Sequence, residues 1–144
     1  MTDFFIKQEI RIDWSDIDAM GHINNLAILK YVQTARVNYI ETIGFNYLHT
    51  AKKIGPILAS THCQFRKPLF YPGQVTVFSK VDYIKTTSFR INHKLFNDKS
   101  ELIAEAQDIM VLYDFINNHK VTISEEIRKK IELLEDKHFS NEIK

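Results

Sequence analysis

Residues 4–14 are the first stretch of the chain with a clear pattern. Apolar and polar residues alternate along it. The apolar parity holds Phe4, Ile6, Ile10, Ile12 and Trp14, and the other parity holds Lys7, Glu9, Arg11 and Asp13. A period of two residues is typical of a strand with one buried side and one solvent-facing side. The pattern therefore predicts a strand over residues 4–14.

A helical period replaces this alternation over residues 26–43. One face of the predicted helix holds Ile28, Val32, Ala35, Tyr39 and Ile43, which follow the spacing of an amphipathic helix. Asn24 or Asn25 is suited to cap its start, and Gly44 is suited to end it. Because further apolar residues lie outside this face, at Leu26, Leu29 and Tyr31, we expect the helix to be largely buried.

Strand patterns fill the middle of the chain after a connector, residues 45–55, that ends at Gly55 and Pro56. They cover residues 57–66, 74–84, 88–97 and 101–115, and the segments between them are rich in turn residues. Ser124 then caps a final helix with Ile127, Ile131 and Leu134 along one side. Short turns between the later strands imply antiparallel pairing. We therefore expect a single α+β domain over residues 1–144, with a curved sheet covering the long helix.

Composition excludes several classes of protein. The net charge of +1 gives no reason to expect nucleic-acid binding, and no apolar run approaches the roughly 20 residues that span a bilayer. The first residues lack the basic and apolar regions of a secretory signal. The single cysteine, Cys63, fits a reducing cytoplasm and is expected to be a buried structural thiol. We therefore expect a cytoplasmic protein without a membrane span.

Chemistry is concentrated in residues 13–25, which read DWSDIDAMGHINN. Three carboxylates, one histidine, one glycine and two amides lie directly before the predicted helix. The start of a helix presents unpaired N–H groups and a partial positive charge. A carboxylate at this place can attack a carbonyl carbon or activate water, while the N–H groups stabilise an oxyanion.

The pattern Asp16-x-Asp18-x-x-Gly21-His22-x-Asn24-Asn25, followed by a long helix, resembles the hotdog-fold acyl-CoA thioesterases, in particular the 4-hydroxybenzoyl-CoA thioesterase family. The resemblance implies a five-stranded antiparallel sheet in the order 1-3-4-5-2, wrapped around the central helix, with a short C-terminal helix. It implies a homodimer or a dimer of dimers, joined along the strand near residues 57–66. The active site would lie at the dimer interface.

The resemblance also assigns roles to residues of the motif. Asp18 aligns with the catalytic aspartate, either as nucleophile or as general base, and Asn25 with the residue whose N–H polarises the thioester carbonyl. Gly21 permits a tight turn or a positive φ. His22 either binds or orients substrate or packs the loop, and the amide of Asn24 is expected to cap the helix. Without the motif, Asp18 would read as an ordinary turn aspartate.

A second candidate stretch is the turn at residues 85–90. In similar enzymes this turn contacts the phosphates of CoA, which would assign Lys85, Thr87, Ser88 and Arg90 to substrate binding; the alternative is an ordinary solvated turn. His22, His62 and His93 lack the spacing of metal ligands. We therefore expect neither a metal nor a cofactor, because CoA is part of the substrate.

Other functions remain open at this stage. A hotdog hydratase needs a different constellation on the central helix, and the absence of histidine from residues 26–48 argues against it. A non-catalytic protein that binds acyl thioesters would bind without turnover. A thioesterase acting on substrates carried by acyl carrier protein would need a basic docking surface.

Overall fold

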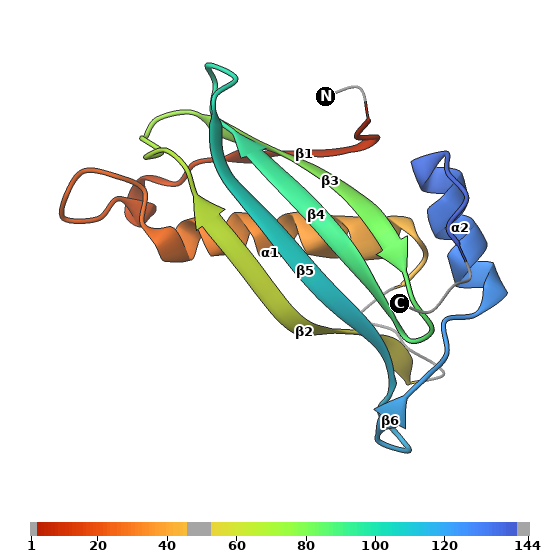
Figure 1. Ribbon diagram of the computed structural model, residues 1–144. Helices are drawn as coiled ribbons and strands as arrows, with labels where there is room; N and C mark the ends of the chain where they lie inside the picture. Colours follow the sequence, from red (N-terminus) through yellow and green to blue (C-terminus); the bar gives the residue numbers. More distant parts are fainter. Residues whose placement is uncertain (1–2, 46–52, 141–144) are drawn as a thin grey trace.

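The computed structural model describes residues 3–45 and 53–140. Its strands are β1 (Ile6–Arg11), β2 (Ile54–Phe65), β3 (Gln74–Ile84), β4 (Ser88–Phe96), β5 (Leu102–Asp114) and the short β6 (His119–Lys120). Its helices are α1 (Asn25–Thr42) and α2 (Glu125–Glu135), and a single 3-10 turn, η1, spans Trp14–Asp16. Figure 1 shows α1 lying across one face of the sheet and α2 standing beside it.

The sheet is antiparallel throughout, in the order β1-β3-β4-β5-β2, and β6 pairs with the end of β5. This confirms the predicted strand order and the hotdog fold. The strand predicted over residues 74–84 matches β3 at both ends. In the described part of the chain, β2 pairs only with β5, so β2 forms one edge of the sheet.

Helix α1 begins and ends within one residue of the bounds that the sequence predicts. Of the two candidate caps, Asn24 is the one used: its Oδ1 accepts the N–H of Ala27 at 2.7 Å. Gly44 follows the helix with a φ of +101°, a conformation that glycine adopts without a steric penalty. The predicted stripe of Ile28, Val32, Ala35, Tyr39 and Ile43 is buried throughout.

The core consists of two apolar clusters along α1. The first contains Ala27, Ile28 and Val32 with residues of β3, β4 and β5, and the second contains Tyr39, Ile40 and Ile43 with the other halves of these strands and with α2. Ser124 caps α2 through its hydroxyl, as predicted, and Ile131 of α2 is fully buried in the second cluster. The long helix is thus held along its whole length by one face of the sheet.

Three predictions about local structure are wrong. Trp14 leaves the strand for η1 and is 70% exposed, because the carboxylate of Asp13 accepts the N–H of Ser15 and turns the chain. Gly55 and Pro56 lie inside β2 rather than before it; an edge strand tolerates a proline that cannot donate. Leu26 is 78% exposed, so its side chain in the first turn of α1 is not buried by the rest of the described chain.

None of the helices in residues 3–45 and 53–140 combines the length and the apolar character needed to cross a bilayer. The connector residues 46–52 and the chain end after 140 lie outside the described residues.

Candidate active site

The segment from Asp13 to Asn24 forms a closed loop that leads directly into α1. Ile17 and Ile23 form an isolated antiparallel bridge. The N–H and the side-chain Nδ2 of Asn24 both donate to the backbone oxygen of Asp16, at 2.9 Å each. Asp16 therefore orders the loop through its main chain. These bonds fix the loop to the first turn of the helix.

Asp18 lies in the middle of this loop, and its side chain is held but remains exposed to solvent. Its Oδ1 accepts the N–H of Met20 at 2.9 Å and the N–H of His22 at 3.1 Å. Its own N–H donates to the oxygen of His22 at 2.7 Å. An exposed carboxylate that backbone donors orient is accessible to a substrate and is fixed in direction.

The start of α1 presents a free donor beside this loop. Asn25 is the first helical residue, and its N–H has no acceptor among the described residues. Such N–H groups are the unsatisfied donors of every helix start. The side chain of Asn24 is committed to Ala27 and Asp16, so it caps the helix and clamps the loop. A reacting carbonyl placed between Asp18 and Asn25 would meet an anion and an N–H donor.

Gly21 and His22 shape the turn of the loop. Gly21 has a φ of +80°, and a side chain there would be strained by the backbone rather than by its neighbours. The imidazole of His22 packs edge-on against the ring of Phe70, with ring centroids 5.1 Å apart. The structure therefore gives His22 a packing contact, and its predicted contact with substrate stays a prediction.

Apolar side chains surround the loop without cover. Trp14, Met20 and Leu26 are 70%, 79% and 78% exposed, and Phe65 at the nearby end of β2 is 44% exposed. Scattered apolar residues on a surface are ordinary, whereas a contiguous group of large ones is typical of a binding surface.

The second predicted stretch forms the hairpin between β3 and β4. The N–H of Lys85 donates to the oxygen of Ser88 at 2.7 Å, and the oxygen of Thr87 accepts the N–H of Leu112 at 2.9 Å. Arg90 is bound by the carboxylate of Asp82 and stacks over Tyr83. The hydrogen bonds to Asp82 raise the pKa of Arg90 above its ordinary value. Of the two cations, Lys85 is the one without a carboxylate partner among the described residues.

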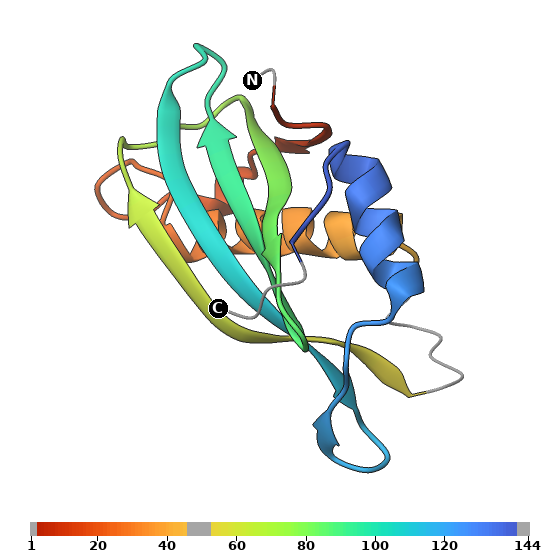
Figure 2. The same ribbon diagram turned by 45° about the vertical axis from the view of Figure 1, so that its right-hand side comes forward.

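The two predicted stretches do not meet within one chain. In Figures 1 and 2 the loop before α1 and the β3–β4 hairpin lie at opposite ends of the sheet. Asp18, Gly21, His22, Asn24 and Asn25 therefore form one group, and Lys85, Thr87, Ser88 and Arg90 form another.

A buried polar cluster at the middle of the sheet is absent from the sequence-based predictions. The carboxylate of Asp108 on β5 accepts hydrogen bonds from Arg36 Nε of α1 at 2.9 Å and from Thr61 Oγ1 of β2 at 2.7 Å. His93 Nε2 of β4 lies 2.7 Å from the same carboxylate, and His93 Nδ1 lies 2.7 Å from Ser79 Oγ of β3. The cluster joins five elements between the two apolar clusters.

The order of serine, histidine and aspartate in this cluster does not make a hydrolytic triad. Ser79 and His93 are each 1% exposed and Asp108 is fully buried, so no substrate reaches the hydroxyl. Burial opposes the charge of Asp108, but the hydrogen bonds from His93, Arg36 and Thr61 outweigh it and hold its pKa below the ordinary value. The cluster is a structural device that keeps a charged carboxylate inside the domain.

One signal for this cluster is present in the sequence. His93 shares its parity with Phe89, Ile91 and Leu95, and Asp108 shares its parity with Ala104, Ala106 and Met110. A histidine and an aspartate on the buried parity of neighbouring strands need polar partners. The sequence of either strand alone, however, does not specify which strands become neighbours in the sheet.

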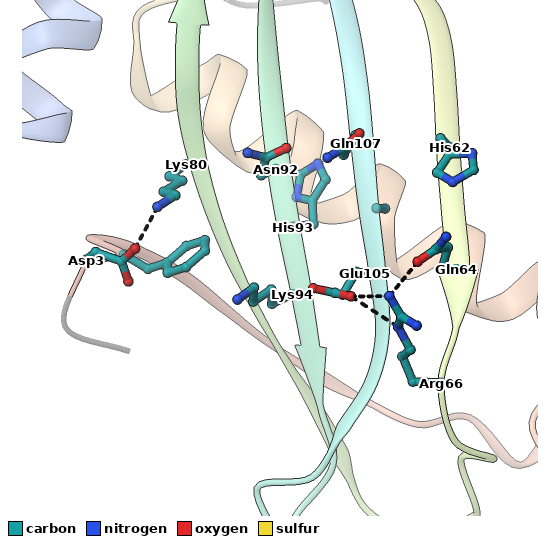
Figure 3. Close-up of a pocket in the computed structure, with 12 residues that line it drawn as sticks. Asp3, His62, Gln64, Arg66, Lys80, Asn92, His93, Lys94, Glu105 and Gln107 are labelled. Atoms are coloured by element: carbon teal, nitrogen blue, oxygen red, sulfur yellow. Dashed lines mark hydrogen bonds and ion pairs between the residues drawn. The ribbon is translucent and has the colours of Figure 1, made fainter.

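The opposite face of the sheet carries a hollow of about 490 Å³. Figure 3 shows Asn92, Lys94 and Gln107 on the face away from α1, with Lys80 paired to Asp3 and Arg66 paired to Glu105. The side chain of His93, which also borders the hollow, is bonded to Asp108 on the other face. No residue of the loop or of the hairpin predicted from the sequence lines it. Within the described residues, no group of three or more histidines, cysteines or carboxylates is placed to hold a metal ion. Cys63 is half-buried, and its burial raises the pKa of the thiol.

Comparison with known proteins identifies the same family as the loop motif. The family model described as the thioesterase-like superfamily matches residues 12–131. The long-chain acyl-CoA thioesterase FadM of Escherichia coli is 20% identical over 128 residues, which are 88% of this chain and 97% of that protein.

Solved structures have the same fold. A thioesterase from Thermus thermophilus, crystallised with coenzyme A and zinc, is 23% identical with a TM-score of 0.84, covering 95% of this chain and 98% of that one. A DHNA-CoA thioesterase from Staphylococcus aureus is 22% identical with a TM-score of 0.78, covering 90% of this chain and 92% of that one.

Proposed function

The chain belongs to the thioesterase-like superfamily and is a thioester hydrolase of the hotdog fold, and from this premise we propose that it is an acyl-CoA thioesterase with Asp18 as its catalytic carboxylate. The observation that carries the assignment is the exposed Asp18 side chain, held by the N–H groups of Met20 and His22. The relatives from Escherichia coli and Staphylococcus aureus are thioesterases of CoA thioesters with different acyl groups, which supports CoA as the leaving group.

In this proposal the thioester carbonyl lies between Asp18 and the start of α1. Asp18 attacks the carbonyl carbon or takes a proton from the attacking water. The N–H of Asn25 then donates to the developing oxyanion, a type of contact typically worth about 3 kcal/mol in the transition state. The bond to sulfur breaks and CoA leaves as the thiolate. Where water is the nucleophile this step gives the free acid directly, and where Asp18 is the nucleophile a water molecule then hydrolyses the mixed anhydride formed on Asp18 and releases the acid.

A second copy of the chain completes the site in this proposal. Edge strand β2 offers an unpaired side for another β2, and Leu58 and Phe65 on it are 40% and 44% exposed. A two-fold axis across that edge reverses the direction of the sheet, so the hairpin end of one protomer lies towards the loop end of its partner. Lys85 of one chain would then meet the CoA phosphates of a substrate bound at Asp18 of the other.

The decisive experiment is hydrolysis of acyl-CoA by Asp18→Asn. The amide keeps the size and the acceptor oxygen of the carboxylate but removes the anionic nucleophile or base. We expect kcat to fall about 100-fold or more, with KM nearly unchanged and the melting temperature preserved, because Asp18 is exposed. Release of free thiol from CoA is the readout.

Asp16→Asn is the matched control, since it makes the same chemical change two residues away, where the main chain carries the role. It should lose much less activity. A folded Asp18→Asn protein with near wild-type kcat would contradict the proposal.

Lys85→Ala tests the hairpin. Because phosphate contacts are remote from the reacting carbonyl, their loss should raise KM several-fold and leave kcat nearly constant. The effect should shrink as salt screens the charges. Lys7→Ala, on the strand that pairs with the other half of β3, removes the same charge as a control. Equal KM values for the Lys85→Ala, Lys7→Ala and wild-type proteins at low salt would show that the hairpin does not bind the CoA phosphates.

A further inference from the structure

Four residues of α1 define a strip that begins at the proposed oxyanion donor. Asn25, Leu29, Val32 and Arg36 are spaced four, three and four residues apart, so they lie on one side of the helix. Arg36 reaches Asp108 of β5, whose carboxylate also accepts the hydroxyl of Thr61 on β2. This side of α1 therefore faces β5 and the edge strand β2.

The sheet opposite this strip is apolar. Cys63 and Phe65 of β2 lie opposite Ala106 and Ala104 of β5, on the same parity as Thr61 and Asp108. Ala104 and Ala106 belong to the first apolar cluster, and Cys63 packs against it. Phe65 is exposed at the end nearest the loop. Val32, Ala104 and Ala106 are covered in the core, so an acyl group that leaves Asn25 along α1 would first meet the accessible parts of Leu29, Cys63 and Phe65.

The polar cluster of Arg36, Asp108 and Thr61 lies farther along this path of the acyl group. Arg36 lies eleven residues after Asn25, which is about 16 Å along a helix. Its guanidinium is only 11% exposed and is bound at 2.9 Å to a carboxylate that is fully buried. A hydrocarbon chain that passed this point would have to displace Arg36 from Asp108 and leave a buried charge without its partner, which costs more than burying a few methylene groups gains.

We propose that the acyl group of the substrate binds in a slot between α1 and β2, and that Arg36, Asp108 and Thr61 form the floor of this slot and select a compact acyl group, aromatic or short aliphatic, over a long chain. The proposal rests on the proposed function, because it starts the acyl group at Asn25. Arg36 and Thr61 are specificity-determining in this arrangement, and Asp108 positions them both.

The first test is hydrolysis of benzoyl-CoA, butyryl-CoA and dodecanoyl-CoA by the wild-type protein. We expect kcat/KM for benzoyl-CoA or butyryl-CoA to exceed that for dodecanoyl-CoA at least 10-fold, the order of discrimination that pocket size supplies. A value for dodecanoyl-CoA equal to the others or higher would overturn the floor.

Thr61→Ala tests the floor itself, because it shortens one side of the cluster and leaves the ion pair of Arg36 and Asp108 in place. We expect the ratio of dodecanoyl to benzoyl activity to rise about 5-fold. Thr34→Ala makes the same change on the solvent side of α1, where the hydroxyl bonds only the backbone of Lys30, and should leave the ratio unchanged. A ratio that moves equally in both variants, or in neither, would contradict the assignment.

Measurements of ligand binding test the proposed floor independently of catalytic activity. The thioethers S-benzyl-CoA and S-dodecyl-CoA are not hydrolysed, and their dissociation constants can be measured by calorimetry. Tighter binding of S-benzyl-CoA supports the floor even if no acyl-CoA is hydrolysed, in which case the proposed catalytic function fails alone. Equal or tighter binding of S-dodecyl-CoA overturns the floor, as would the absence of binding by both.

Discussion

Two aspartates of this protein are hydrogen-bonded in opposite ways. Asp18 is exposed and accepts two backbone N–H groups from its own loop. Asp108 is fully buried and accepts side-chain donors from Arg36, Thr61 and His93, which come from three other elements. The Asp18 carboxylate is accessible to solvent, whereas the Asp108 carboxylate is enclosed by the protein.

The difference separates a group that can react from a group that holds the fold. A reacting carboxylate needs access and a fixed direction, and short-range backbone donors supply direction without covering it. A buried carboxylate needs enough donors to offset its desolvation, and those donors tie together the elements that carry them. We therefore expect substitutions at Asp18 to change activity, and substitutions at Asp108 to change stability first.

The largest effect on stability is expected for Asp108→Asn. The substitution leaves the guanidinium of Arg36 without its carboxylate at a site where that side chain is 11% exposed. Removing one partner of a buried ion pair typically costs about 3–5 kcal/mol, so denaturant unfolding should show a loss of this order. Asp18→Asn, the same chemical change at the exposed aspartate, should stay within about 0.5 kcal/mol of wild type.

Comparable losses of stability in Asp108→Asn and Asp18→Asn would contradict the expected difference between the two aspartates. They would mean that the loop around Asp18 is part of the cooperative core, or that the Arg36–Asp108 pair contributes little.

Acid should expose the same contrast through titration. The pKa of Asp108 is lower in the folded chain than its ordinary value, so its stabilising contribution is present above the unfolded pKa of about 3.9 and is lost as the pH falls through the folded pKa. The melting temperature of the wild type should therefore approach that of Asp108→Asn as the pH drops below about 4.

Other carboxylates with lowered pKa values are present in both proteins, so their contribution cancels in the comparison. They are Asp3, Asp13, Glu101 and Asp114. The pKa of Glu135 is shifted in the opposite direction, because burial raises it despite hydrogen bonds from Tyr39 and Val81. A gap between wild type and Asp108→Asn that stays constant from neutral pH into strong acid would show that charge on Asp108 does not stabilise the fold.

The two aspartates also mark what sequence reasoning can reach. The loop around Asp18 is contiguous, and its cap, its glycine and its helix follow one another within residues 13–44, so local rules predict them. The cluster around Asp108 draws residues from α1, β2, β3, β4 and β5. Its members become neighbours only through cross-strand register, such as Thr61 with Asp108, which no single strand specifies.

The errors in the sequence-based strands have the same origin. Trp14 continued the alternation of the first strand, but the hydrogen bonds of Asp13 to Ser15 end the strand earlier. Gly55 and Pro56 have turn chemistry, yet they pair with Tyr113 and Leu112 because β2 lies at an edge. In both cases a tertiary or capping contact outweighed the local preference that the prediction used.

The smallest effect is expected at Asn24, which links the loop of Asp18 to α1. Asn24→Ala removes both the cap on Ala27 and the bond to the backbone oxygen of Asp16, and loss of a cap typically costs about 1 kcal/mol. Asn24→Asp keeps an acceptor for the cap but loses the Nδ2 donor, so it isolates the clamp on the loop. If the clamp orients Asp18, both variants should lose kcat, while only Asn24→Ala should lose the full stability of the cap. Unfolding curves and acyl-CoA hydrolysis on the same preparations measure the two quantities. Full activity in Asn24→Asp would show that the bridge of Ile17 with Ile23 and the bonds to Met20 and His22 are sufficient to hold the carboxylate.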